Sequence, residues 1–464
     1  MAKKKSSLKK LEEKLSLKKE SAWKGYKTTK KVMDFGDAYK TFLDASKTER
    51  DCAKSVVKQL KKSGFKDMSY LKSAKKGDKL YLNYKEKVVA ALVVGRDMSR
   101  FNLVGSHMDS PRLDLKQSPL YEDSSVALFK SHYYGGIKKY QWVNLKLAMH
   151  GIAYTKQGKK VEFSYGEKAD EPKFVIPDLL PHLARHQMEK NAREFIGGED
   201  LNIVVGNIPV DDKDVKDKIK LNVLQILNKN FGITEEDFSF AEINFVPAEN
   251  SVDVGFDRGM IGAYGQDDKV CVYTSLRAII EIKNPSATAV SYFTDKEEIG
   301  SDGDTGAKSR FLLNLAEKYA SLVGINNSPS NILMNSKAIS ADVSALVNPN
   351  FSDVHEKRNA SYIGNGLIME KYTGSGGKYS ANDASAEYLS EIRKILVKEN
   401  ISWQTGELGK IDIGGGGTIA KFLSSYGMDT LDAGPGVIAM HSPLELTSKV
   451  DVYEAYRFYK AFFN

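Results

Sequence analysis

Two adjacent carboxylates, Glu297 and Glu298, follow an apolar run from Thr288 to Phe293 that is typical of a buried parallel strand. The two carboxylates of such a doublet can have different roles in hydrolysis. One carboxylate can ligate a divalent metal while its neighbour takes a proton from a water that the metal activates. The doublet therefore predicts metal-assisted hydrolysis if the chain supplies further ligands.

Two histidines in short motifs are candidate ligands. His107 lies in GSHMDSP, directly after the apolar run from Asn102 to Gly105, and His441 lies in AMHSPLE. A metal-bound histidine usually presents its second ring nitrogen to a carboxylate, and Asp109 is placed for that contact. The H-x-D pair thus predicts a ligand with its orienting partner.

Acidic candidates complete the set. Asp267 and Asp268 in GQDDK precede an amphipathic helical run from Val270 to Ile282, and Asp342 in SADVSA follows the apolar stretch from Asn331 to Met334. An aspartate at a loop-to-helix junction can bridge two metals, although it can also simply cap the helix. All these segments are strand ends or loops in an alternating strand and helix pattern, where open α/β sheets build their sites. This shared context favours a metal centre.

Six motifs in fixed order carry a resemblance to a known family: GSHMDSP, QDDK, DKEEIGS, SADVSALVNPN, DIGGGGTIA and GVIAMHSPLE. The chain resembles the aspartyl aminopeptidase family of dinuclear zinc metallopeptidases, in its bacterial form, from about Ala22 to Phe463. The resemblance implies two groups of site residues: the metal ligands His107, Asp267, Glu298, Asp342 and His441, and the catalytic residues Asp109 and Glu297.

The same resemblance implies a role for each of these residues. His107 and Asp342 would hold one metal, Glu298 and His441 the other, and Asp267 rather than Asp268 would bridge the two. Glu297 would be the general base and Asp109 the orienting carboxylate. Zinc is the expected metal for mixed histidine and carboxylate ligands, with cobalt or manganese as alternatives.

Two segments depart from the family pattern. Histidines found after the metal-binding aspartate in eukaryotic members are absent here, where Ala345 and Asn348 stand, and the segment GGIKKYQW has no histidine either. These segments are expected to line the specificity pocket, and the remaining cationic candidates are Lys371, Lys378 and His355. We therefore expect cleavage of neutral N-terminal residues alongside the acidic ones that the family prefers.

The order of the motifs predicts the domain organisation. One ligand precedes a middle segment rich in tyrosine and in alternating apolar patterns, and four follow it, so the catalytic domain must be discontinuous. We predict an α/β fold with a mixed, mostly parallel sheet flanked by helices and an inserted strand-rich second domain. The predicted parts are a basic N-terminal tail (1–21), a catalytic domain (22–116 and 251–464) and an inserted oligomerisation domain (117–250).

Periodicity predicts individual elements within these parts. Expected helices are Phe35 to Ser46, Ala53 to Ser63 and a piece near Leu179 to Lys190. Expected strands are Lys79 to Leu82, Val88 to Val94, Asn102 to Val104, Leu145 to Met149 and Lys160 to Phe163. The glycines 414–417 are expected to open a short helix from Ile419 to Ser424, where backbone amides could bind an anion.

Composition restricts the function classes. With 464 residues and 41% apolar content, the chain can form two domains with sizeable cores. The two cysteines, Cys52 and Cys271, are too few for a disulfide scaffold and lack zinc-ribbon spacing. The net charge of +8 comes partly from the tail, and no nucleic-acid-binding motif or membrane-spanning run is present. A cytoplasmic enzyme that binds neither nucleic acid nor membrane is expected.

The predicted activity is release of N-terminal residues from peptides by a metalloaminopeptidase, assembled as a large homo-oligomer, a dodecamer by the family resemblance. Motif spacing alone leaves two alternatives. A carboxypeptidase or N-acyl amino acid deacylase could use the same metals, and a self-assembling binding protein could retain the site without activity.

Overall fold

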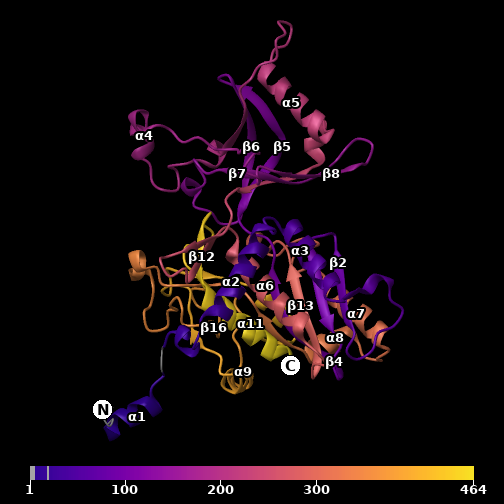
Figure 1. The fold of residues 1–464 in the computed structure, drawn as a ribbon, viewed down its shortest axis with the longest axis vertical. Helices are drawn as coiled ribbons and strands as arrows, with labels where there is room; N and C mark the ends of the chain where they lie inside the picture. The colour runs from indigo at the N-terminus through magenta and orange to yellow at the C-terminus, as the bar shows by residue number, and fades with distance from the viewer. Residues whose placement is uncertain (1–5, 18–19) are drawn as a thin grey trace.

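The computed structural model describes residues 6–17 and 20–464. Two sheets dominate it, one above the other in Figure 1. The lower body contains a nine-stranded sheet between helices, and the upper body contains a six-stranded antiparallel sheet with one long helix. This arrangement confirms the predicted mixed α/β fold with additional antiparallel strands.

The nine-stranded sheet has the order β1-β2-β3-β13-β4-β14-β20-β16-β18. Its strands are β1 (Lys66–Asp67), β2 (Lys79–Tyr84), β3 (Val88–Val93), β4 (Asp97–His107), β13 (Ala287–Thr294), β14 (Lys337–Ser340), β16 (Leu367–Glu370), β18 (Trp403–Thr405) and β20 (Asp429–Gly434). Five neighbouring pairs are parallel and three are antiparallel. The central strands β13, β4, β14 and β20 are mutually parallel, so their carboxyl ends meet at one edge.

Helices cover both faces of this sheet because successive strand residues point to opposite sides. In β3, Val89 and Ala91 pack on one face and Val88 and Ala90 on the other. The first face is covered by α2 (Lys30–Asp44), α3 (Glu49–Lys62), α6 (Gln266–Glu281), α9 (Ala386–Lys398) and α11 (Lys449–Phe463). The second face is covered by α7 (Phe311–Val323), α8 (Pro329–Met334) and α10 (Ala420–Ser424).

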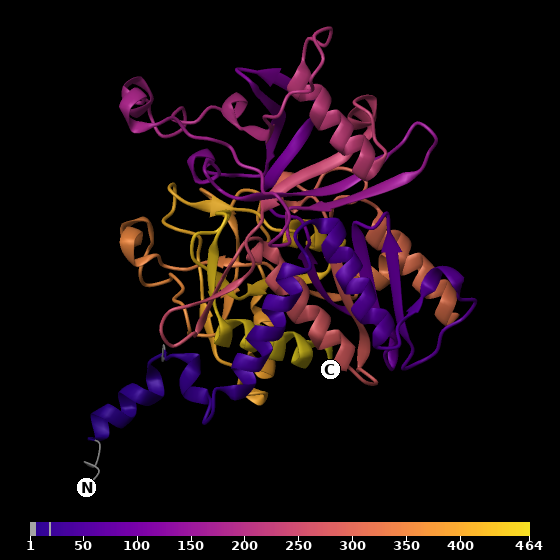
Figure 2. The same ribbon diagram turned by 45° about the horizontal axis from the view of Figure 1, so that its top comes forward.

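The six-stranded sheet has the order β8-β7-β10-β5-β6-β9. Its strands are β5 (Arg112–Asp123), β6 (Val126–Tyr134), β7 (Leu147–Tyr154), β8 (Lys160–Tyr165), β9 (Asn202–Gly206) and β10 (Glu242–Pro247). The helix α5 (Lys218–Phe231) packs on it and closes a separate apolar core, as Figure 2 shows. We call the residues 112–247 that form this sheet the inserted sheet region; β5 begins before the predicted boundary at residue 117, and that boundary stays a prediction.

Smaller elements complete the described chain. Three strands, β11 (Val252–Val254), β12 (Met260–Ala263) and β22 (Glu445–Ser448), form one sheet. Two short pairs are β15 (Ser344–Ala345) with β21 (Gly436–Val437) and β17 (Gly374–Ser375) with β19 (Gly415–Gly416). The helix α1 (Ser7–Leu15) projects from the body and buries no residue. No described helix is long and apolar enough to cross a membrane.

Several local expectations differ from the structure. The helix α6 is buried on nearly all sides rather than amphipathic, because it lies between the sheet, α2 and α11. The stretch before Asp342 contains helix α8, and the strand that leads to this residue is β14. The piece near residues 179–190 contains only a short turn and α4 (Arg185–Met188). The pattern within one segment does not show which distant elements will pack against it.

Candidate metal centre

Three adjacent parallel strands deliver the first site residues to one place. His107 is the last residue of β4, Glu297 and Glu298 follow β13, and Asp342 follows β14. Because β13, β4 and β14 are neighbours, their carboxyl ends lie side by side. This is the edge at which open α/β sheets bind ligands.

Two further residues reach the same edge from other elements. Asp267 lies in the first turn of α6, and its side chain is buried. His441 lies in the loop between β21 and β22 with a backbone φ of 65°, in the left-handed region that a residue with a side chain rarely adopts. This conformation at His441 matches the tendency of strained backbone to gather at functional sites.

Within the described residues, the five candidate ligands form two triads that share Asp267. The first triad contains His107, Asp267 and Asp342, and the second contains Asp267, Glu298 and His441. His107 Nε2 lies 3.2 Å from Asp267 Oδ1 and 3.7 Å from Asp342 Oδ1. His441 Nε2 lies 3.3 Å from both Asp267 Oδ2 and Glu298 Oε2. The two oxygens of Asp267 therefore face different triads.

Both histidines are oriented by contacts through their other ring nitrogen. His107 Nδ1 lies 3.1 Å from the carbonyl oxygen of Asp109 and 3.3 Å from its carboxylate. His441 Nδ1 lies 2.8 Å from the carbonyl oxygen of Gly136, in the inserted sheet region. A carbonyl can only accept, so this nitrogen of His441 donates, and Nε2 is the ring atom that faces the triad.

Asp109 also fixes the carboxylate doublet. Its two carboxylate oxygens accept the backbone N–H groups of Glu297 and Glu298 at 3.1 and 3.2 Å. The Tyr134 hydroxyl, from β6, donates to the same carboxylate at 2.9 Å. Asp109 thus joins the loop after β4, the loop after β13 and the inserted sheet region.

Two site residues escaped the sequence reasoning. Glu445 on β22 is buried and accepts the backbone N–H groups of Asp267 at 3.1 Å and His441 at 2.8 Å. These two hydrogen bonds fix the positions of two candidate ligands relative to each other. Tyr134 was missed as well. Glu445 belongs to the quoted motif AMHSPLE, whereas Tyr134 stands next to the glycine pair of GGIKKYQW, and no spacing rule links either of them to the ligands.

Burial and crowding of acids dominate the electrostatics. Burial raises the pKa of Glu297 to about 8 and that of Glu298 well above its usual range, and neighbouring carboxylates add to both shifts. Burial opposes ionisation of Asp267 too, but the close contacts with the His107 and His441 rings outweigh it and lower its pKa. A concentrated negative cluster of this kind needs a positive partner.

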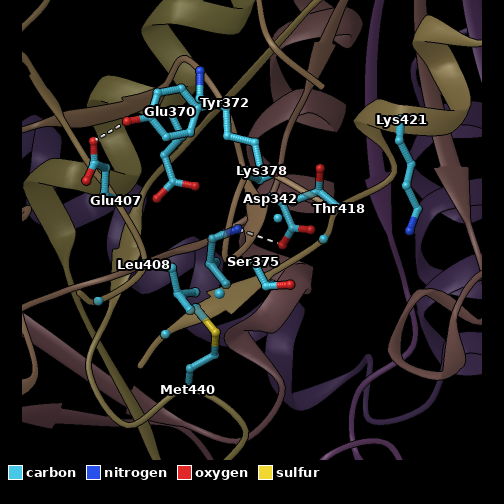
Figure 3. A pocket seen from close by; sticks show the side chains of 18 of the residues that line it. Asp342, Glu370, Tyr372, Ser375, Lys378, Glu407, Leu408, Thr418, Lys421 and Met440 are labelled. Carbon is cyan, nitrogen blue, oxygen red and sulfur yellow. Dashed lines mark hydrogen bonds between the residues drawn. The ribbon is translucent and has the colours of Figure 1, made fainter. Parts of the chain in front are cut away.

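One cavity of about 460 Å³ opens on the cluster. Asp342, Glu370, Tyr372 and Lys378 are among the residues that line it (Figure 3). The glycines 414–417 line it as well, but the helix after them, α10, has only five residues. The expected anion site at that helix stays untested.

Comparison with known proteins agrees with this geometry. The profile of the family described as aminopeptidase I zinc metalloprotease (M18) matches residues 42–463. The chain is 46% identical over 454 residues to a probable M18 family aminopeptidase 1 of Clostridium acetobutylicum, covering 96% of this chain and 98% of that protein. The chain belongs to the M18 aminopeptidase family.

Solved structures agree with this membership. An M18 family aminopeptidase of Thermotoga maritima superposes with a TM-score of 0.94 at 43% identity, covering 97% of this chain and 100% of that one. The S. cerevisiae mApe1 dodecamer has the same fold at 21% identity, with a TM-score of 0.75 and coverage of 93% of this chain and 97% of that one. The predicted family and the predicted metal-dependent aminopeptidase activity are confirmed.

Membership of the M18 family implies zinc, and the residues present fit this metal. Two ligand atoms around a tetrahedral zinc at about 2.0–2.1 Å lie about 3.3 Å apart, close to the separations within both triads. Asp267 Oδ1 and Glu298 Oε1 are buried without a hydrogen-bond partner among the described residues. A cation in each triad would give both carboxylates an opposite charge.

Proposed function

We propose that this chain binds two divalent metals, one in each triad, with Asp267 as the shared ligand. His107 and Asp342 would complete the first site, and Glu298 and His441 the second. The observation that carries this proposal is the placement of the two Asp267 oxygens toward different histidines, at 3.2 and 3.3 Å. Zinc suits the mixed donor set best, with cobalt or manganese as alternatives.

Glu297 is the proposed general base. It belongs to neither triad, and its Oε2 lies 4.0 Å from His107 Nε2 on the wall of the cavity. When bound, the metals supply Lewis-acid activation of water and of the scissile carbonyl. Glu297 accepts the proton of the attacking water and donates it to the leaving amine, while Asp109 keeps the doublet and His107 in position.

The proposed substrates are peptides with a free N-terminus. An acidic preference would need a cation in the cavity. Of the lysines expected to supply it, Lys378 is paired with Asp383 at 2.9 Å, and Lys371 lies 3.9 Å from the same carboxylate. Lys410 and Lys421 are the other lysines that line the cavity. Neither Lys371 nor His355 lines the cavity. These contacts favour cleavage of neutral N-terminal residues alongside the acidic ones that the family prefers.

The decisive experiment compares Glu297→Gln with Glu298→Gln in kinetics and metal content. We expect Glu297→Gln to keep its metal and to lose about 10²- to 10⁴-fold in kcat, the usual cost of a missing general base. Glu298→Gln should lose metal as well as activity. Loss of a full metal equivalent from Glu297→Gln would mean that the two roles are reversed.

We also propose that residues 117–250 form a separate domain that makes subunit contacts in a closed homo-oligomer. Support comes from its independent apolar core and from the dodecameric assembly of mApe1. Light scattering tests this, and a stable, active monomer would contradict it. A cytoplasmic location is proposed as well, because Cys52 and Cys271 are both free and buried.

A further inference from the structure

Two further carboxylates, Glu370 and Glu407, lie on one part of the cavity wall, whereas Lys410 and Lys421 also line the cavity. Glu370 ends β16, and its cross-strand partner on β20 is Asp432. Both residues are buried, and Glu370 is only 7% exposed. Next to Glu370 along the cavity wall, the Tyr372 hydroxyl donates to Glu407 at 2.7 Å. In Figure 3, Glu370, Tyr372 and Glu407 lie on one side of the cavity, with Glu370 turned toward its centre.

Among the described residues, no Lys or Arg forms a salt bridge with Glu370. One oxygen of Glu370, Oε1, has no hydrogen-bond partner among the described residues although it is buried. Burial raises the pKa of Glu370 to about 8, and the further causes include the neighbouring Asp432 but no Lys or Arg. Lys378 Nζ lies 3.9 Å from the centroid of the Tyr372 ring, but it already forms an ion pair with Asp383. Lys421 stands across the cavity from Glu370 (Figure 3).

The position of Glu370 suits a substrate side chain. In the sheet, only β20 lies between β16 and β14. Neighbouring strands lie about 4.7–4.9 Å apart, so β16 runs about 10 Å from β14, the strand that leads to Asp342. A substrate whose α-amino group and scissile carbonyl lie at the metal ligands would span this gap with a long N-terminal side chain. The α-amino group, one bond from the substrate Cα, would stay near the ligands.

We propose that Glu370, with the neighbouring Tyr372–Glu407 pair, forms the subsite for the N-terminal side chain and selects lysine and arginine over aspartate and glutamate. This inference rests on the proposed aminopeptidase mechanism and deepens it. A cationic side chain would give Glu370 the partner that it lacks. An acidic side chain placed against Glu370 would add a like charge beside Glu370 and Asp432, which disfavours its binding there.

The test is a panel of aminoacyl substrates with N-terminal Lys, Arg, Leu, Asp and Glu, assayed on the metal-loaded full chain and on Glu370→Gln. We expect kcat/KM to be higher for Lys and Arg than for Asp and Glu in the unmodified chain. Glu370→Gln should lower kcat/KM for Lys and Arg about 10- to 100-fold, the value of one hydrogen bond between charged groups. Cleavage of the Leu substrate should stay close to that of the unmodified chain.

Two further variants sharpen the test. Glu387→Gln removes an exposed glutamate on α9 outside the cavity, so it should leave the whole panel unchanged. Asp383→Asn frees Lys378 on the cavity wall and should raise Asp and Glu cleavage relative to Leu. A preference of the unmodified chain for Asp and Glu would overturn the proposal. An equal loss on every substrate in Glu370→Gln would overturn it too, since it would assign Glu370 to the α-amino group or to the fold.

Calorimetry separates this proposal from the mechanism on which it rests. Lysine hydroxamate should bind the metal-loaded chain more tightly than glutamate hydroxamate, and Glu370→Gln should abolish the difference. If this binding difference appears without peptide cleavage, the proposed function fails and the subsite stands. If peptides are cleaved but neither binding nor kcat/KM discriminates between Lys and Glu, the subsite fails and the proposed function stands.

Discussion

The two sheets contribute to the metal centre in different ways. The nine-stranded sheet supplies ligands at the carboxyl ends of β4 and β14 and the acidic doublet after β13. The inserted sheet region supplies none of the triad residues, but it contacts the centre through the Tyr134 hydroxyl and the Gly136 carbonyl. Parallel strand ends bring most of the candidate ligands together, and the inserted sheet region adds two of the groups that orient the site.

The largest expected effect tests whether Asp267 is the residue that the two triads share. Asp267→Ala should lose both metals and essentially all activity, because its two oxygens face the two triads. Asp268→Ala should keep at least one metal, because Asp268 Oδ2 accepts the backbone N–H of His107 at 3.2 Å and belongs to neither triad. Metal analysis of the two purified variants decides the matter. Equal metal content in both would refute the choice of Asp267.

The stability contributed by the contact between the two regions should depend on pH. His150 on β7 is buried between Asp51 of α3 and Glu167, at 3.0 and 2.7 Å. Burial lowers its pKa, but hydrogen bonds to Asp51 and Glu167 outweigh this and raise it to about 9. Because the folded pKa exceeds the unfolded value of about 6.5, the stabilisation is complete below about pH 6.5 and is lost as pH rises through about 9.

The variant His150→Gln measures this contribution. It should lower the free energy of unfolding at pH 6 by an amount on the order of 3 kcal/mol, given about 1.4 kcal/mol per pKa unit. At pH 10 the deficit should nearly disappear. Denaturant midpoints at the two pH values test it, and a deficit that is the same at both would exclude the charged histidine as its source.

A smaller effect is expected where the inserted sheet region contacts Asp109. Tyr134→Phe removes the 2.9 Å hydrogen bond to this carboxylate and should weaken metal binding or activity about 10-fold, at the low end for a group that orients a metal ligand. The matched control is Tyr133→Phe, which alters an exposed neighbour. Titration of the apo chain with zinc gives the readout. Unchanged metal affinity and activity in Tyr134→Phe would show that the inserted sheet region does not support the centre.

The smallest effect should come from removing the first seventeen residues. In α1 no residue is buried, so the deletion should change the unfolding midpoint and the activity very little. Thermal denaturation and peptide kinetics check this expectation. A large loss of either would give the basic tail a structural role that the exposure of α1 does not indicate.

The sequence predicted the elements whose signal is local. The run from Thr288 to Phe293 lies within β13, and the motif that contains His107 ends β4 as expected. Local pattern could not reveal that β13 pairs in parallel with β4 but antiparallel with β3, because pairing depends on strands distant in the chain. It also could not reveal Tyr134, since its hydroxyl meets Asp109 only after the inserted sheet region folds back.

The position of the insertion also fixes the order in which the site can be made during synthesis. Strand β4 pairs with β13 and β14, and both follow the inserted sheet region in the chain. A growing chain therefore carries His107 on a strand without either of these neighbours until the whole insertion has been translated. His441, which follows β20, is translated last among the five triad residues. A chain interrupted anywhere before His441 contains no complete second triad, so an incomplete copy lacks one of the two candidate metal sites.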